Sequence, residues 1–194
     1  MAVLYSHHGT IVRYSEGYVV HGVEIGTQTW SDRNLDLTFD GLQFNISTVD
    51  AVPTAYYNSN SFKKNYGLLY NWYAIKYIND NADRLIPGWH IATESDYSTL
   101  FSYIGGQSQC YNKLRSIVWS SGTDSYLFSA LPSGYGNPTS SPKCQQVGNE
   151  INLGTSTEVS NTTYKVYLIK PSENSTFNHT KGLGTAVRLV RDVT

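Results

Sequence analysis

Few side chains in this chain have the types and spacing that acid–base, nucleophilic or metal chemistry requires. The five histidines form neither a His-Glu-x-x-His motif nor another ligand pair, so no zinc site is predicted. Cys110 and Cys144 lie too far apart in the sequence for a local metal knuckle, and one disulfide between them is possible but not required. We therefore expect no catalytic residue, no metal ligand and no cofactor.

Motifs for nucleotide binding and for acyl transfer do not occur either. The sequence has no Gly-x-Ser-x-Gly or Walker A pattern, and Gly182-Leu-Gly184 lacks both the third glycine and the strand-to-helix context of a dinucleotide-binding loop. The carboxylates Glu94 and Asp96 stand at the predicted start of a helix, where negative charge is favoured. We assign them to that helix start and not to catalysis.

The composition favours recognition through polar aromatic side chains. Tyrosine occurs 16 times, and aromatic residues make up 13% of the chain, whereas charged residues make up only 15%. Tyr, Ser, Gly and Asn are enriched in antibody binding loops because they give contact area and hydrogen bonds at low entropic cost. The alternative is that the tyrosines simply fill strands. A net charge of −1, from 14 basic and 15 acidic residues, predicts no nucleic-acid partner. No apolar run reaches the roughly 18 residues that a membrane span requires.

The clearest predicted element is an amphipathic helix over about 94–104. Thr93 can cap it together with Asp96, three residues on, and Gly105-Gly106 ends it. Its apolar positions recur at helical spacing and are Tyr97, Leu100, Phe101 and Ile104. The pattern predicts a helix that lies on a sheet.

Strands are predicted toward both ends of the chain, which indicates the α+β class. Residues 1–30 favour a hairpin that ends at Trp30, and residues 164–169 and 185–190 alternate like strands. We expect the last of these either to lie in the centre of the sheet or to close it, and to pair near the N-terminal strands around Val19–Ile25. Several other segments carry weaker patterns: short strands mixed with an exposed loop over 36–64, a strand passing into a short helix over 68–78, mostly loop over 128–142, and a polar turn over 170–184.

Motifs of aromatic residues and glycine, three of them with a tryptophan, occur in four segments of the chain. They are Ile25-Gly-Thr-Gln-Thr-Trp30 with Asn34-Leu35, Tyr66-Gly-Leu-Leu-Tyr-Asn-Trp-Tyr73, Pro87-Gly-Trp-His90 followed by Thr93, and Phe128-Ser-Ala-Leu-Pro132 with Gly134-Tyr135. Together with the closing Val187-Arg188-Leu-Val-Arg-Asp192, these motifs resemble the repeated secreted module called the Fibrobacter succinogenes major paralogous domain. The resemblance covers residues 22–192.

That family is similar to proteins of the C-type-lectin-like fold, in which N- and C-terminal strands pair at the base and a long loop region carries the ligand surface. The resemblance implies a single domain over residues 1–194, with the lectin-like module at 22–192 and a strand or hairpin extension at 1–21. It also implies that four tryptophans are core or loop anchors: Trp30, Trp72, Trp89 and Trp119.

Three motifs expected of relatives differ in this sequence. Calcium-dependent lectins carry Glu-Pro-Asn or Gln-Pro-Asp and a later Trp-Asn-Asp, and none of these triplets occurs here. The formylglycine-generating enzymes of the same fold rely on paired reactive cysteines, which Cys110 and Cys144 do not match. Before Thr155 the family usually carries two tryptophans, whereas Leu153 and Gly154 stand here.

We therefore predict a non-enzymatic module that recognises a cell-surface carbohydrate or protein through its C-terminal loops. It would act as a phage receptor-binding protein or a bacterial surface adhesin, outside the cell, and it could form oligomers. The Asn-rich block 149–179 also fits a variable region of a diversity-generating retroelement. Two alternatives stay open: a structural surface or tail-fibre component, and an enzyme related to the formylglycine-generating group.

Polar and aromatic residues of the C-terminal third are the predicted ligand contacts. They are Asn152, Asn161, Thr162, Tyr164, Tyr167, Asn174, Thr176, Asn178 and His179. Because Tyr164 and Tyr167 lie three apart on a predicted strand, they face opposite sides, and at most one of them is expected to be exposed.

Overall fold

A six-stranded sheet joins the two ends of the chain in the computed structural model, which describes residues 4–6, 9–13, 19–119, 122–171 and 173–193, with side chains from Val20 onward. The strand order is β1 (Leu4–Ser6), β2 (Gly9–Arg13), β3 (Val19–Ile25), β4 (Gln28–Ser31), β15 (Leu189–Asp192) and β8 (His90–Ile91). Val190 pairs with Trp30 on one side and with His90 on the other. The C-terminal strand therefore lies inside this sheet.

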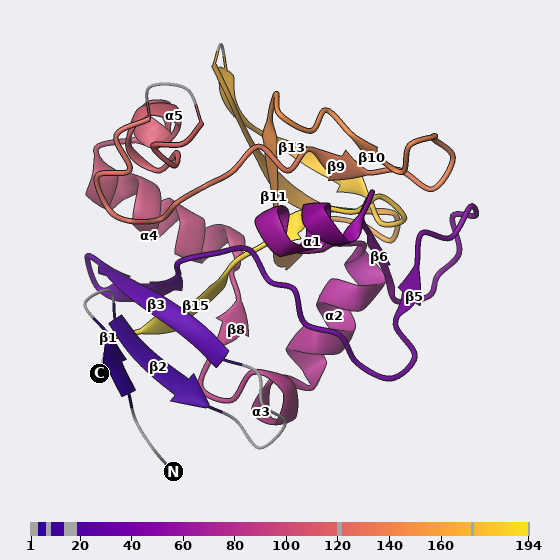
Figure 1. The fold of residues 1–194 in the computed structure, drawn as a ribbon, viewed down its shortest axis with the longest axis horizontal. Coiled ribbons are helices and arrows are strands. Elements are labelled where there is room, and N and C mark those ends of the chain that lie inside the picture. The colour runs from indigo at the N-terminus through magenta and orange to yellow at the C-terminus, as the bar shows by residue number, and fades with distance from the viewer. Residues whose placement is uncertain (1–3, 7–8, 14–18, 120–121, 172, 194) are drawn as a thin grey trace.

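A second sheet is built from the C-terminal third of the chain. Its order is β13 (Glu173–Thr180), β12 (Thr163–Lys170), β11 (Ile151–Glu158) and β14 (Ala186–Val187), with β14 parallel to β11 and the other pairs antiparallel. In Figure 1, β1, β2 and β3 lie at the lower left, β11 and β13 lie at the upper centre, and β15 runs from the lower left toward the centre. Only Arg188 separates β14 from β15, so one residue links the sheets.

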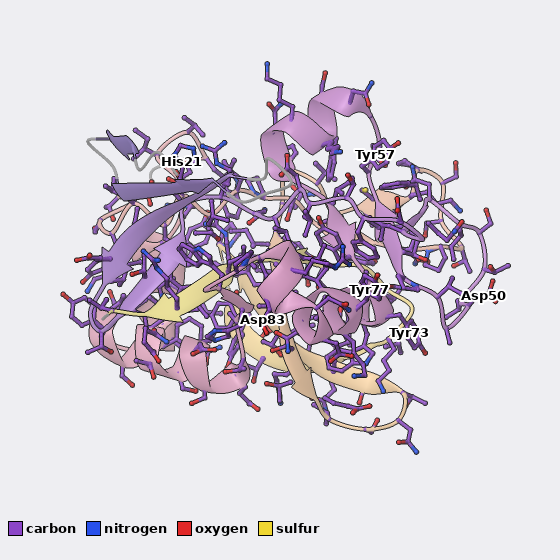
Figure 2. The ribbon with its side chains drawn as sticks, turned by 90° about the horizontal axis from the view of Figure 1, so that it is seen from below. His21, Asp50, Tyr57, Tyr73, Tyr77 and Asp83 are labelled. Atoms are coloured by element: carbon purple, nitrogen blue, oxygen red, sulfur yellow. The ribbon has the colours of Figure 1, made fainter. Side chains whose placement is uncertain are left out.

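Two helices, α2 (Trp72–Asp80) and α4 (Glu94–Ile104), lie between the sheets (Figure 1). Thr93 and Asp96 form the capping box at the start of α4, and Gly105 ends it in a left-handed conformation. The predicted helix is thus confirmed at both ends. Asn71 caps α2, whose inner residues are buried, while Tyr73 and Tyr77 lie along its outer side and Asp83 stands on the adjoining α3 (Ala82–Leu85), as Figure 2 shows.

Shorter elements fill the connections between these layers. They are a three-stranded sheet of β5 (Gln43–Phe44), β6 (Thr54–Tyr56) and β7 (Leu69–Tyr70), a pair of β9 (Tyr135–Gly136) and β10 (Cys144–Gln145), helix α1 (Asn60–Tyr66), the 3-10 helix η1 (Gln107–Gln109) and α5 (Cys110–Lys113). The strand-to-helix pattern expected over 68–78 is confirmed by β7 and α2, and residues 128–142 are mostly irregular, as predicted.

Tryptophan side chains anchor the core. Trp30, Trp72 and Trp89 are buried, and Trp119 is half-buried against the hydrophobic cluster that contains Trp30. Trp30 packs against Tyr97 of α4 with ring centroids 5.0 Å apart, which ties the terminal sheet to the helix. The anchoring role predicted for the four tryptophans agrees with this packing. No helix among the described residues is both long and apolar enough to cross a bilayer.

Three local predictions were wrong. The polar turn expected over 170–184 contains the eight-residue strand β13, because β12 offers it a complete antiparallel partner. The short strands expected over 36–64 are present as β5 and β6, but the end of that segment forms helix α1, capped by Ser59, where loop was expected. The single strand expected over 185–190 is two strands in two sheets; its second part has the central position that was one of the two expected, and it pairs with β4, the neighbour of β3. The expected hairpin itself is present as β3 and β4.

The predicted extension at 1–21 contains β1 and β2, which pair with each other and continue the sheet beyond β3. Residues 1–3, 7–8 and 14–18 of that extension lie outside the described part of the chain.

Candidate functional site

A cleft of about 310 Å³ opens where three segments distant in the sequence meet. The segment after β4 forms one part of its lining, the C-terminal half of α1 forms another, and the segment before β9 forms the third, with Arg188 reaching in from the link between the sheets. In Figure 1, α1 lies between the segment that follows β4 and the segment that leads into β9. The cleft falls within the size range of small-molecule sites in proteins.

Arg188 holds two of these segments together. Its side chain is 1% exposed. Its Nη1 donates to the backbone oxygens of Ser31 and Phe128 (both 2.7 Å), its Nη2 donates to that of Ser129 (3.3 Å), and its Nε donates to Asn34 Oδ1 (2.8 Å). The guanidinium also lies 4.3 Å from the centroid of the Phe128 ring. Burial lowers the pKa of Arg188 to about 10, so the group stays protonated at neutral pH.

Asn34 carries the link onward to α1. Its Nδ2 donates to the Tyr66 backbone oxygen at 2.9 Å, while its Oδ1 accepts from Arg188. Gly67, which follows α1, has φ of 77°, and a side chain there would bring a Cβ within 2.6 Å of the Leu35 oxygen. Only glycine fits this close approach, so α1 is docked in one position against the segment after β4.

Helix α1 presents two lysines to the cleft. Its buried residue Phe62 packs against Tyr66 with ring centroids 5.1 Å apart, which fixes the inner face of the helix. Lys63 and Lys64 fall in the last turn, where a positive charge interacts favourably with the helix dipole. Within the described part of the chain, neither lysine forms an ion pair with a carboxylate.

The third part of the lining is held by a tight turn over 124–129. Asp124 accepts hydrogen bonds from the Ser129 backbone N–H (2.8 Å) and from its hydroxyl (2.7 Å). Asp124, Leu127 and Ser129 have φ of 45°, 56° and 52°, a region that non-glycine residues rarely adopt. Such backbone strain persists only where surrounding contacts hold it, and here Arg188 and Asp124 do so.

The family model described as Fibrobacter succinogenes major domain matches residues 23–191. This chain belongs to that family. No curated protein and no solved structure matches it significantly. All the cleft residues, from Asp32 to Arg188, lie inside the stretch that the Fibrobacter succinogenes major domain model covers. The resemblance inferred from the tryptophan motifs is thereby confirmed.

Three of the nine predicted contact residues of this family member are buried. Tyr164 is 0% exposed and its hydroxyl contacts Thr185 at 3.0 Å, while Tyr167 is 3% exposed and donates to the Glu94 oxygen. Asn152 is also buried, and its amide donates to Glu150. These three residues serve the core, so the expectation that they contact a ligand at the surface needs correction.

The remaining six predicted residues are spread over two places. Asn161 and Thr162 are exposed in the turn between β11 and β12. On β13, Thr176 and Asn178 are exposed, and Asn174 is half-buried with its amide donating to Ser108. None of the nine lines the cleft.

His179 points to the other face of β13, because alternate residues of a strand face opposite ways. Its ring lies among three aromatic rings, those of Phe177, Tyr135 and Tyr164, at centroid distances of 5.2, 5.9 and 6.1 Å. Burial lowers the pKa of His179 to about 4, which leaves the imidazole neutral at physiological pH. It packs as an aromatic side chain.

The cleft residues were missed by sequence reasoning, although one signal was present. Arg188 stands in an otherwise apolar strand pattern, and a lone arginine at such a position indicates a buried guanidinium that organises its surroundings. Lys63 and Lys64 carried no such signal, because a pair of lysines in a polar segment is usually a solvated surface.

The two cysteines are free and buried, and burial raises the pKa of each thiol to about 12. A thiol with this pKa stays protonated near neutral pH, where only the thiolate is a good nucleophile. Among the described residues, no group of three or more His, Cys, Asp or Glu side chains could hold a metal ion.

Proposed function

We propose that this domain is a non-enzymatic recognition module that binds a cell-surface carbohydrate in the cleft beside Arg188. The observation that carries the proposal is the way the lining is fixed: one buried guanidinium ties the segments after β4 and before β9, and Asn34 ties the first of them to α1. A site held by buried hydrogen bonds is already organised before its ligand arrives, which lowers the cost of binding.

The side chains around the cleft suit a sugar. Tyr66 offers a half-buried ring, and Asn65, Asp32 and Arg33 offer planar polar groups that can exchange hydrogen bonds with hydroxyls. Concave sites of this size combine a few polar groups with apolar surface. A protein partner would instead be expected to use a flatter and larger surface.

The fold we propose is C-type-lectin-like, which supports a binding role by analogy alone. In favour of it, β15 pairs with β4 at the base, α2 and α4 lie between two sheets, and a long irregular segment runs from α5 to β11. The same analogy supports the proposal that the protein acts outside the cell, on a bacterial surface or a phage virion, and that diversity-generating retroelements act on such genes.

An enzymatic role finds less support. The protonated, buried thiols of Cys110 and Cys144 argue against chemistry of the formylglycine-generating kind. His90 and Asp96 do form a 3.0 Å contact, but the Asp96 carboxylate is engaged in the capping box of α4, where it accepts from the backbone N–H of the N-cap residue Thr93. This pair is explained by helix capping without a catalytic task.

A glycan array tests the proposal with two blocking variants. Asn65→Trp places a bulky side chain at the cleft, and Asn178→Trp places the same side chain on exposed β13, at a residue first predicted to contact the ligand. We expect the parent to bind a saccharide, Asn65→Trp to lose that binding, and Asn178→Trp to retain it. The opposite pattern would move the site to β13, and a parent that binds no saccharide would refute the proposal.

A structural role in assembly is the second candidate, and β13 is the observation that favours it. This eight-residue strand forms the edge of its sheet, and edge strands can pair with another chain. The double variant Thr176→Lys and Asn178→Lys adds charges that oppose edge pairing. If sedimentation velocity shows an oligomer for the parent and a monomer for this variant, the result supports the structural role in assembly.

A further inference from the structure

We propose that the cleft beside Arg188 selects an acidic sugar, whose carboxylate is held by Lys63 and Lys64. The inference rests on the proposed carbohydrate-binding function and names the class of ligand for that site. The charges around the cleft, and the partners that these charged groups have within the protein, support it.

The positive charge of Arg188 has no directly hydrogen-bonded anion within the described part of the chain. All four of its hydrogen bonds end on neutral acceptors, namely Asn34 Oδ1 and the backbone oxygens of Ser31, Phe128 and Ser129. A buried cation is costly unless an anion lies near it. The carboxylates of Asp32 and Asp124 act on it only through space, without a direct contact. An anion bound in the cleft would supply further compensation.

Lys63 and Lys64 differ from the other six lysines of the chain in the partners of their ammonium groups. Four of those contact a carboxylate: Lys76, Lys165, Lys170 and Lys181. The other two, Lys113 and Lys143, donate to backbone or hydroxyl oxygens. Within the described part of the chain, the two lysines with neither kind of partner both line the cleft. Their ammonium groups are available to a ligand.

Positive charges outnumber negative charges in the lining of the cleft. Four cationic side chains line the cleft (Arg33, Lys63, Lys64 and Arg188) against two carboxylates, Asp32 and Asp36. The Asp32 carboxylate is already paired with Arg33 at 3.1 Å. The chain as a whole has a net charge of −1, so this excess belongs to the cleft and not to the protein in general.

The two carboxylates also indicate which anion fits. Asp32 and Asp36 are hydrogen-bond acceptors beside the lysines, and the hydroxyls of a sugar can donate to them, whereas a fully ionised phosphate has no donor to offer. A monoanionic carboxylate on a sugar ring can therefore face the lysines while its hydroxyls meet the polar groups of Asn65 and Asp32. The combination of lysines with nearby acceptors therefore favours an acidic sugar over a free phosphate ion.

The experiment measures binding of galacturonate, glucuronate and sialate oligosaccharides by calorimetry, beside matched neutral galactose oligosaccharides and inorganic phosphate. The key variant is Lys63→Gln with Lys64→Gln, which removes both charges but keeps polar side chains of similar length. Lys76→Gln is the matched control, because Lys76 is exposed on α2 and lies outside the cleft. We expect at least one acidic oligosaccharide to bind the parent, to bind the double variant about tenfold more weakly, and to bind Lys76→Gln unchanged.

Added salt should weaken the same interaction more in the parent than in the double variant, because two of the cleft's four positive charges have been removed from the variant. Equal binding of acidic and neutral oligosaccharides, unaffected by the lysine changes, would overturn the inference and leave the carbohydrate function standing. Phosphate that competes as well as the acidic sugar would overturn the choice of carboxylate. If none of the saccharides binds, both proposals fail.

Discussion

The guanidinium of Arg188 donates a 2.8 Å hydrogen bond to Asn34 Oδ1 across 154 residues of sequence. This contact connects the link between the two sheets with the segment after β4, and Asn34 passes it on to the end of α1. The pair therefore fixes both the overall fold and the shape of the proposed site. A change at Arg188 should therefore affect stability and the shape of the proposed site together.

Arg188→Lys is expected to lower the free energy of unfolding by about 3 kcal/mol, because lysine cannot reach the four acceptors at once and leaves buried oxygens unpaired. Arg191→Lys is the control, since its guanidinium lies over the Trp89 ring at 4.8 Å and a lysine can occupy that place. Urea denaturation followed by circular dichroism compares the two. Equal stability of both variants would show that Arg188 is not the organising residue.

His179 is expected to make the protein sensitive to acid. Its pKa is about 4 in the folded protein and 6.5 in the unfolded chain, so the unfolded chain takes up a proton first as the pH falls. Stability is therefore complete above pH 6.5, declines between pH 6.5 and 4 by at most about 3 kcal/mol, and levels off below that. His179→Gln should flatten this part of the stability profile. Parallel profiles for parent and variant between these pH values would contradict the assignment.

Thr93→Ala should cost about 1 kcal/mol, because it removes the hydroxyl that accepts from the Asp96 N–H at 3.1 Å. Thr99→Ala lies on the exposed side of the same helix and should change stability by less than about 0.5 kcal/mol. Thermal melting of both variants at neutral pH checks the difference. A Thr99 variant as unstable as the Thr93 variant would mean that the loss of any threonine hydroxyl from this helix, such as the Thr99 hydroxyl that donates to the Ser95 oxygen, and not the loss of the cap in particular, sets the effect.

Cys110 and Cys144 should be unreactive in the native protein. Because burial raises the pKa of both thiols to about 12, an aromatic disulfide reagent at pH 8 is expected to label neither within minutes. In denaturant it should label two thiols per chain, the full number in the sequence. Rapid native labelling of one cysteine would reveal an accessible thiolate and revive the enzymatic alternative.

Sequence reasoning succeeded where short-range chemistry decides the structure. The bounds of α4 follow from Thr93, Asp96 and Gly105, which lie within one turn of its ends. It failed where a distant partner decides. Strand β13 is polar and resembles a turn, and it becomes a strand because β12 pairs with it along its whole length. Helix α1 is short, and its docking against Asn34 depends on contacts that no local pattern reveals.

The candidate site shows the same division. Tyr164 and Tyr167 were selected for their residue type, yet each packs into a different hydrophobic cluster, on opposite faces of β12. Lys63, Asn34 and Arg188 lie far apart in the sequence, and only the fold brings them to one cleft. Their proximity could not be predicted without knowing that β15 pairs with β4.

The single-residue link between β14 and β15 has a consequence for synthesis. A chain that emerges from the ribosome N-terminus first contains β4, β8 and β11 long before Ala186–Asp192 arrives to pair with all three. Until then β4 and β8 in the first sheet and β11 in the second each have an unpaired edge, which can associate with other chains. The module should therefore fold late, slowly and in one step, and any partner that shields these edges during synthesis would raise its yield.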